Sequence, residues 1–217
     1  MDRIFGYDSP IIQTINKIVD CVFVSILWIL FMIPIVTIGA STTAFYYTVN
    51  KVIRHHRSHV FREFFAAFKS NFKQSTIVWL ITAAFGYVLV ADCYVIWLEA
   101  KAGKVSLYTM LPYAISLALI IIWSFYVYGS IARFENGLKL TMKNCAFFVF
   151  RHLLRSILIL VVFAALIVGI LFLPVVIFIL PTICMFLITV ILESIFQRYM
   201  SEEDLEAEAE RNQTYYV

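Results

Sequence analysis

The sequence predicts an all-α fold, a polytopic transmembrane helical bundle of about six spans with amphipathic interfacial helices. Of its 217 residues, 62% are hydrophobic and 14% are charged, whereas soluble globular chains are about half apolar and a quarter charged. The apolar residues also form long uncharged runs, at 21–50, 105–132 and 156–192. About 20 apolar residues cross a bilayer as a helix, and these runs lack the alternation of a membrane β-barrel.

The first run, in residues 18–50, is too long for one straight pass and short for two. Pro34 and Gly39 lie in its middle, and Ser41 is a candidate N-cap for a helix that continues into the next basic stretch. Two interpretations are open, a single span or a helical hairpin. The hairpin gives six spans, and it is favoured because it places the basic residues near the N-terminus in the cytoplasm.

The remaining runs divide into four spans. Pro174 and Pro181 interrupt the last run, which at about 1.5 Å per residue would be twice the hydrocarbon thickness as one helix. A polar link at 99–104 separates the two spans that precede it. The predicted spans are 75–98, 105–131, 156–173 and 176–196.

The Lys and Arg residues predict the orientation of the spans. Six of them lie in 51–74 and five in 132–155, and short basic loops stay in the cytoplasm. The chain is therefore expected in the cell (cytoplasmic) membrane, as a multi-pass protein with both termini cytoplasmic. Residues 1–200 are expected to form one transmembrane domain, followed at 201–217 by an acidic cytoplasmic tail.

An aromatic face runs along 60–73, where phenylalanines recur at helical spacing beside Lys and Arg. Residues 138–155 carry a similar pattern of Phe, Leu and basic residues. Helices of this kind anchor a protein in the membrane interface, or they dock a cytoplasmic or membrane partner. The candidate partner-docking residues are Phe61, Phe64, Phe65, Phe68 and Phe72.

Two pairs of segments indicate an internal repeat. FKSNFKQS (68–75) and FRHLLRS (150–156) share a Phe, a base, a large apolar residue, a second base and a Ser before a span. AFYYTVNKVIR (44–54) and SFYVYGSIARF (124–134) are both aromatic span ends that lead into basic loops. Repeats occur in many transport folds, and convergent chemistry at a membrane edge is the alternative. Copies of an amphipathic helix followed by a helical hairpin would lie near 1–57, 58–134 and 135–200.

Three histidines, His55, His56 and His59, lie beside Arg54 and Arg57. The i, i+4 spacing of His55 and His59 can hold a metal ion on a helix face, and titrating histidines can sense pH. No further ligand is evident nearby, and the two arginines repel a cation. The stretch is interpreted as a basic patch at the membrane edge, and no metal or cofactor is predicted.

Three acidic residues lie within predicted spans, Asp20, Asp92 and Glu193. A charge inside a membrane is costly, so each is a candidate polar site within the bundle. Structural pairing is the alternative, with bases close in sequence: Lys17 for Asp20 and Arg198 for Glu193. Asp92 is the strongest candidate, because the nearest bases reach it only if the following loop folds back.

No catalytic motif occurs in the sequence, which lacks G-x-S-x-G, H-E-x-x-H and the phosphate-binding P-loop. The chain is therefore not predicted to be an enzyme, and no catalytic residue is assigned. Its basic stretches are too short and too close to the membrane for nucleic acid. The chain is expected to be embedded in the lipid bilayer.

Three segments resemble the YesL-like family of bacterial integral membrane proteins, itself a domain of unknown function: FGYDSP (5–10), TIGASTTAFYY (37–47) and FREFFAAFKSNFKQSTIVW (61–79). The likeness covers most of the chain and is strongest in residues 1–80. It implies the inner membrane of a bacterium. Members are often encoded beside carbohydrate uptake systems, which implies an accessory or regulatory component associated with the permease subunits of a sugar ABC transporter.

The family has no established catalytic or binding residues, so the resemblance assigns none here. A small transporter or channel that acts alone is the alternative function, motivated by the internal repeat and by Asp92.

Overall fold

The computed structural model describes residues 10–54, 59–134, 136–200 and 202, and within these ranges it contains helices and no strand. Its longer helices are α1 (Pro10–Met32), α2 (Ile38–Thr48), α3 (Val60–Lys101), α4 (Leu111–Arg133), α5 (Leu138–Arg151), α6 (Leu153–Phe172) and α7 (Leu180–Phe196). The all-α prediction is confirmed. Five helices of the described chain are long and apolar enough to cross a membrane: Ile15–Met32, Val60–Lys101, Leu107–Arg133, Leu153–Phe172 and Leu180–Tyr199.

Residues 18–50 fold as two helices joined by a turn, but only the first is long and apolar enough to be a candidate span, so the favoured prediction of two spans is not confirmed here. α1 ends at Met32, and Pro34, which has no N–H to continue a helix, precedes a short 3₁₀ turn that ends at Thr37. The hydroxyl of Thr37 donates to the carbonyl of Phe31 at 2.6 Å. One of the free carbonyls at the end of α1 is thereby satisfied within the turn.

α2 is enclosed by the helices around it; its buried residues are Gly39, Ala40, Ser41, Thr42, Thr43, Ala44, Phe45, Tyr46 and Thr48. It begins at Ile38, so the prediction of Ser41 as its N-cap is wrong. Ser41 instead donates across the hairpin to the carbonyl of Trp28, at 2.9 Å. The helix continues as a π-helix over Val49–Arg54. These 11 and 6 residues together are shorter than a typical span, which accounts for five candidate spans instead of six.

Gly39 sets the distance between α2 and α3. A Cβ atom at Gly39 would lie 2.4 Å from the carbonyl oxygen of Ser75 and 2.7 Å from the Cβ atom of Trp79. One turn later, the buried hydroxyls of Thr43 and Ser75 lie 2.8 Å apart. Small and hydroxyl-bearing residues therefore hold the two helices in close contact, as they do in many membrane proteins.

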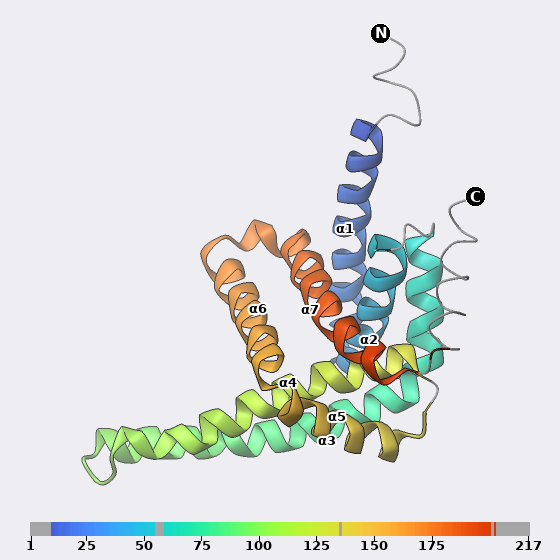
Figure 1. The fold of residues 1–217 in the computed structure, drawn as a ribbon. Coiled ribbons are helices and arrows are strands. Elements are labelled where there is room, and N and C mark those ends of the chain that lie inside the picture. The colour runs from blue at the N-terminus through green and yellow to red at the C-terminus, as the bar shows by residue number, and fades with distance from the viewer. Residues whose placement is uncertain (1–9, 55–58, 135, 201, 203–217) are drawn as a thin grey trace.

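α3 is one continuous helix of 42 residues, about 63 Å long. The predicted interfacial helix at 60–73 and span at 75–98 are therefore joined without a break, although the first part of α3 and the part beside α4 run in different directions (Figure 1). The helix continues because neither Pro nor Gly, the strongest helix breakers, occurs before Gly86. The second half of α3 pairs with α4, and the two form a long hairpin that extends away from the other helices (Figure 1).

The last three helices follow the predicted division of the chain. α5 ends at Arg151, α6 begins at Leu153, and α6 packs against α7 (Figure 1). Pro174 opens the 3₁₀ turn between α6 and α7. Pro181 lies in the first turn of α7, where a backbone N–H would have no partner within the helix, so its absence costs no hydrogen bond.

The two serines that suggested a repeat hold similar positions near the start of an apolar stretch. Ser75 bonds to Thr43, and Ser156 lies 3.2 Å from the hydroxyl of Tyr126. Both serines are buried. The repeat itself stays a prediction, and in the first of these two copies the amphipathic helix and the span are fused into α3.

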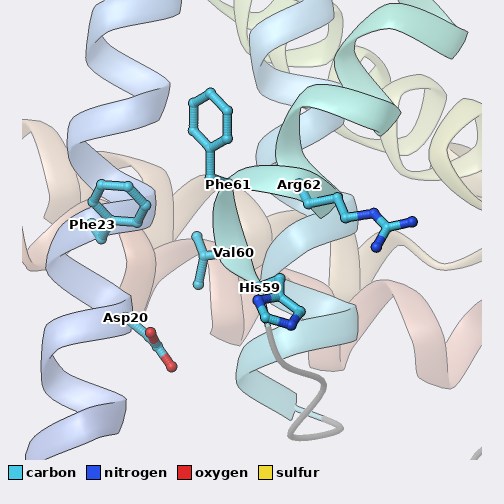
Figure 2. A pocket seen from close by; sticks show the side chains of 6 residues that line it. All are labelled: Asp20, Phe23, His59, Val60, Phe61 and Arg62. Carbon is cyan, nitrogen blue, oxygen red and sulfur yellow. The ribbon is translucent and has the colours of Figure 1, made fainter.

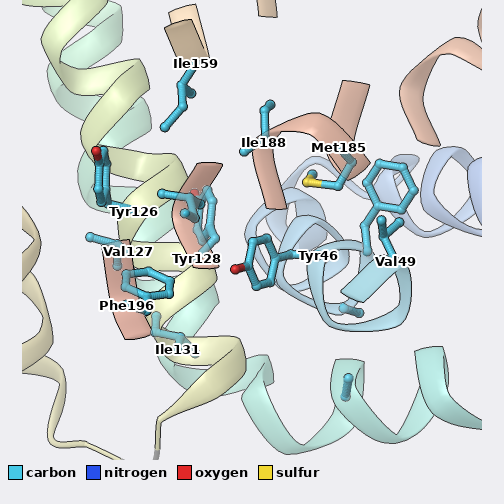
Figure 3. Close-up of a cluster of buried hydrophobic side chains, with 14 of the residues drawn as sticks. Tyr46, Val49, Tyr126, Val127, Tyr128, Ile131, Ile159, Met185, Ile188 and Phe196 are labelled. Carbon is cyan, nitrogen blue, oxygen red and sulfur yellow. The ribbon is translucent and has the colours of Figure 1, made fainter. Parts of the chain in front are cut away.

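The hydrophobic core lies where α2, α4 and α7 meet. Tyr46, Tyr126 and Phe196 are each no more than 2% exposed, and Figure 3 shows them gathered with Met185 and Ile188 of α7. Buried aromatic rings of this size dominate core packing. The polar cluster described next lies directly beside this core.

Candidate functional site

Several segments that the sequence placed at the cytoplasmic edge come together in the structure. Lys51 of the π-helix forms an ion pair with Glu63 of α3, with 2.6 Å between Nζ and Oε2. Arg155 of α6 donates to the carbonyl of Ser194 on α7 at 3.3 Å. The basic residues after α2 and around α5 thus lie near the end of α7.

Glu193 is the centre of a buried polar cluster in this region. Its side chain is 1% exposed. Oε1 accepts a hydrogen bond from the hydroxyl of Tyr46 at 2.8 Å and one from the amide of Asn50 at 3.1 Å. Oε2 forms an ion pair with Arg133, whose side chain is 9% exposed. The guanidinium of Arg133 also contacts the sulfur of Met200 at 3.1 Å.

Three elements position these groups. Tyr46 and Asn50 lie four residues apart, at the end of α2 and the start of the π-helix, so both face α7. Arg133 is the last residue of α4. One turn earlier, Gly129 leaves room for the ring of Tyr46, which a Cβ atom would approach to 3.3 Å. The cluster therefore depends on the packing of α2 against α4 and α7.

The arrangement neutralises the charge of Glu193. A carboxylate has about four acceptor positions, and here three donors from separate elements occupy both of its oxygens. A buried charge is stable only when it is paired and hydrogen-bonded in this way. The cluster is thus suited to fasten α2, α4 and α7 to one another, and it presents no open carboxylate to a solute.

The structure gives Glu193 a partner that its place in the sequence did not suggest. The expected base was Arg198, five residues further along α7, whereas the observed partner is Arg133 at the end of α4. Sequence reasoning also missed Tyr46 and Asn50. Their polar groups at i, i+4 within an apolar run were the signal that could have identified them.

Asp92 lies far along α3, in the hairpin with α4, and is half-buried. Within the described ranges its carboxylate forms no hydrogen bond or ion pair. Lys101, one of the bases in the adjoining link, lies instead over the ring of Trp97, 3.8 Å from its centroid. Asp92 is therefore separate from the Glu193 cluster.

Asp20 lies on α1 and lines a surface pocket between α1 and the start of α3 (Figure 2). It is half-buried, and it does not form the expected ion pair with Lys17 in the part of the chain that the structure describes. The three predicted intramembrane acids thus lie at three different places. Only Glu193 is brought into a cluster of polar groups.

The predicted phenylalanine face is divided by α1. Phe64 is completely buried, and Phe31 of α1 packs against it and against Phe68, with ring centroids 5.5 and 4.9 Å apart. Phe61 and Phe65 stay partly exposed, with their rings stacked 6.2 Å apart. The ring of Phe65 also meets that of Phe31, with centroids 6.3 Å apart. The name Phe edge is used below for the three exposed members of the face: Phe61, Phe65 and Phe72.

The bundle also contains an apolar cavity of about 380 Å³ between α1, α2, α3, α4, α6 and α7. Trp28, Phe45, Phe163 and Met185 are among its lining residues. The few hydroxyls that reach it include Thr42, which already donates to the carbonyl of Ile38 at 2.8 Å. The cavity is therefore an apolar space without a charged wall.

His59 is the described member of the predicted basic patch, and His55 and His56 lie outside the described residues. His59 is exposed and precedes α3 in a left-handed backbone conformation, with φ of 75°. Among the described residues no group of three His, Cys, Asp or Glu side chains could hold a metal ion. The acidic tail, apart from Glu202, also lies outside the described chain.

Comparison with known proteins identifies one domain. Residues 21–93, about a third of the chain, match the family described as "Protein of unknown function, DUF624". No curated protein and no solved structure matches the chain. The matched region contains α2, the Phe edge and Asp92, whereas Arg133 and Glu193 lie beyond it. The matched residues run from within α1 to the outer part of α3.

Proposed function

We propose that this chain is an accessory or regulatory component of the bacterial cytoplasmic membrane that associates with the permease subunits of a carbohydrate ABC transporter. Its several long apolar helices support a multi-pass membrane protein. The link to carbohydrate uptake rests on the resemblance of segments such as 61–79 to the YesL-like family. The docking role rests on the Phe edge.

The Phe edge is the observation that carries the docking proposal. Phe61 and Phe65 are 54% and 45% exposed, although Phe64 between them is completely buried. Exposed basic side chains, among them Arg62 and Lys69, lie on the same stretch of helix. Aromatic and Arg side chains are enriched in protein interfaces and often supply most of their binding energy.

α5 supplies a second surface of the same composition. Phe147 and Phe150 are 53% and 66% exposed. The guanidinium of Arg151 lies 5.4 Å from the centroid of the Phe147 ring. Two amphipathic stretches thus combine exposed aromatic rings with bases, an arrangement suited to a helix of a membrane partner or to the lipid interface.

The proposed topology places the termini and the basic segments in the cytoplasm. Lys and Arg are abundant in the stretch after α2 and in residues 132–155. Short basic loops stay on the cytoplasmic side of the membrane. Glu193, which accepts from Asn50 and forms an ion pair with Arg133, supports one shared location for the beginnings of these two stretches. Cysteine labelling of single-cysteine variants at Lys104 and at Lys143 should report opposite sides of the membrane.

Purification from native membranes tests the docking proposal. Tagged protein, extracted in a mild detergent, should bring permease subunits with it in a fixed ratio, as identified by mass spectrometry. The double substitution Phe61→Ala/Phe65→Ala should lower their recovery at least tenfold, because hot-spot truncations each cost about 1–2 kcal/mol or more.

Phe85→Ala is the matched control for that experiment, since Phe85 is 63% exposed but lies on the outer part of α3. It should leave the recovery unchanged. Equal recovery with the Phe61→Ala/Phe65→Ala protein and the control would contradict the docking proposal. Recovery of the chain alone would remove the link to a permease.

Transport by the chain itself is a second candidate function, and Asp92 is the observation that favours it. A half-buried carboxylate within an apolar span, without a partner in the described chain, is a candidate ion or solute contact. Liposomes that contain only this protein should then show solute flux that Asp92→Asn abolishes. Glu99→Gln at the end of α3 is the control. Liposomes without flux would count against this function.

A further inference from the structure

A surface pocket of about 480 Å³ lies between α1 and the start of α3. Figure 2 shows its lining, which combines one acid, two nitrogen-bearing side chains and apolar side chains: Asp20, Phe23, His59, Val60, Phe61 and Arg62. Neither the Glu193 cluster nor Asp92 contributes to it. Its position beside the basic stretch after α2 places it at the predicted cytoplasmic edge of the membrane.

The charged groups of this pocket do not neutralise one another. Within the described ranges, Asp20 and Arg62 form no ion pair and no hydrogen bond through their side chains. In Figure 2 the carboxylate of Asp20 and the ring of His59 come from α1 and α3, and the guanidinium of Arg62 extends away from Asp20. A half-buried carboxylate without a partner among the described residues is unfavourable, so a ligand with charges of both signs would be stabilised here.

An apolar track leads away from the pocket along α1. Phe23, Ile26 and Leu30 are 41%, 40% and 54% exposed. Their spacing of i, i+3 and i+7 places them on one face of the helix. A molecule whose charged end occupies the pocket could therefore lay a hydrocarbon chain along this face, which identifies a membrane lipid instead of a small soluble zwitterion.

We propose that this pocket binds the headgroup of a phospholipid that carries a primary amine, phosphatidylethanolamine in its simplest form. The ammonium group binds the carboxylate of Asp20. The phosphate binds the ring of His59 and, after rotation of its exposed side chain, the guanidinium of Arg62. The first acyl chain follows Phe23 along α1. Phosphatidylglycerol has no ammonium group, and the trimethylammonium of phosphatidylcholine has no N–H to donate to Asp20.

Native mass spectrometry of the full chain in detergent, with dioleoyl forms of the three lipids added in turn, tests this proposal. Phosphatidylethanolamine should be retained about two- to fivefold more than either other lipid, the range for one partly exposed ion pair. Asp20→Asn should remove that preference without changing retention of phosphatidylglycerol. Arg62→Gln should lower the retention of both lipids, because both contain the phosphate.

Glu99→Gln and Lys69→Gln are the matched controls, since each removes one exposed charge of α3 away from the pocket. Neither should change the preference. Equal retention of the three lipids by the unmodified protein would overturn the proposal, and this comparison needs no variant that must fold. Loss of both lipids with Asp20→Asn would also overturn it, because that residue would then act on the structure and not on the amine.

Discussion

The carboxylates of Glu193 and Asp92 lie in two regions that treat a charge in opposite ways. Glu193 is 1% exposed and is held by Tyr46, Asn50 and Arg133. Asp92, in the outer part of the α3–α4 hairpin, is half-buried and has no polar partner among the described residues. The difference shows that an acid within an apolar helix is a structural element in one region and an open group in the other.

The apolar side chains of the two regions differ in the same way. Around α2 the large side chains are enclosed by other helices, whereas Phe85, Tyr87 and Tyr108 of the hairpin are 63%, 77% and 80% exposed. Within the described ranges no other segment covers these side chains, so we expect lipid or a partner to cover them. Substitutions matched between the two regions test this difference.

Phe64→Ala should have the largest effect. It removes a completely buried ring between α3 and Phe31 and should lower the free energy of unfolding by about 3–5 kcal/mol. Phe85→Ala on the hairpin should change it by less than about 0.5 kcal/mol. Unfolding in mixed detergent, followed by circular dichroism, measures both. Similar losses for the two variants would show that the hairpin is packed as tightly as the core.

Gly39→Ala should have an intermediate effect. Its new Cβ atom would lie 2.4 Å from the carbonyl oxygen of Ser75, so α2 and α3 must move apart, which should cost about 1–3 kcal/mol. Gly86→Ala meets no atom within 4 Å and should stabilise α3 by up to about 1 kcal/mol through its helix propensity. If the helix contact is as described, thermal unfolding should show a lower melting temperature for Gly39→Ala and a higher one for Gly86→Ala.

His152 should give the smallest effect, through pH. Desolvation by burial and then the charges of Arg155, Arg198 and Arg151 lower the pKa of His152 from its ordinary value of 6.5. The folded chain therefore binds fewer protons than the unfolded chain near that pKa, so stability should fall as pH drops through about 6.5.

His152 lies 3.1 Å from the hydroxyl of Tyr199 through Nε2, and its protonation adds a positive charge beside Arg155, Arg198 and Arg151. His152→Gln should show a smaller loss of melting temperature between pH 7.5 and 5.5 than the unmodified chain. An equal loss in both proteins would assign the pH dependence to other groups.

Apolar runs and prolines were enough to predict the helical membrane fold and most helix ends. Pro34 and Pro174 mark turns in the structure because proline cannot donate to the preceding helical turn. The continuity of α3 was not predicted, because the basic residues near Lys73 indicated a membrane edge, whereas helix formation depends on backbone hydrogen bonds that those side chains do not interrupt.

The polar cluster was only partly predictable. The cost of a charge in a membrane identified Glu193 as a candidate, but its partner Arg133 lies sixty residues away in the chain. Likewise, the spacing of the phenylalanines predicted one face, and only the packing of Phe31 against Phe64 shows which part of that face is free. Contacts between distant segments are absent from any local pattern.

A double-mutant cycle on Glu193 and Arg133 tests the central claim, that this buried pair is structural. Glu193→Leu and Arg133→Met should each lower the free energy of unfolding by about 3–5 kcal/mol, because each removes one partner of a buried ion pair. The double variant should lose far less than the sum, with a coupling energy of at least about 2 kcal/mol. Additive losses, or single losses below about 0.5 kcal/mol, would contradict the claim and make Glu193 as open a group as Asp92.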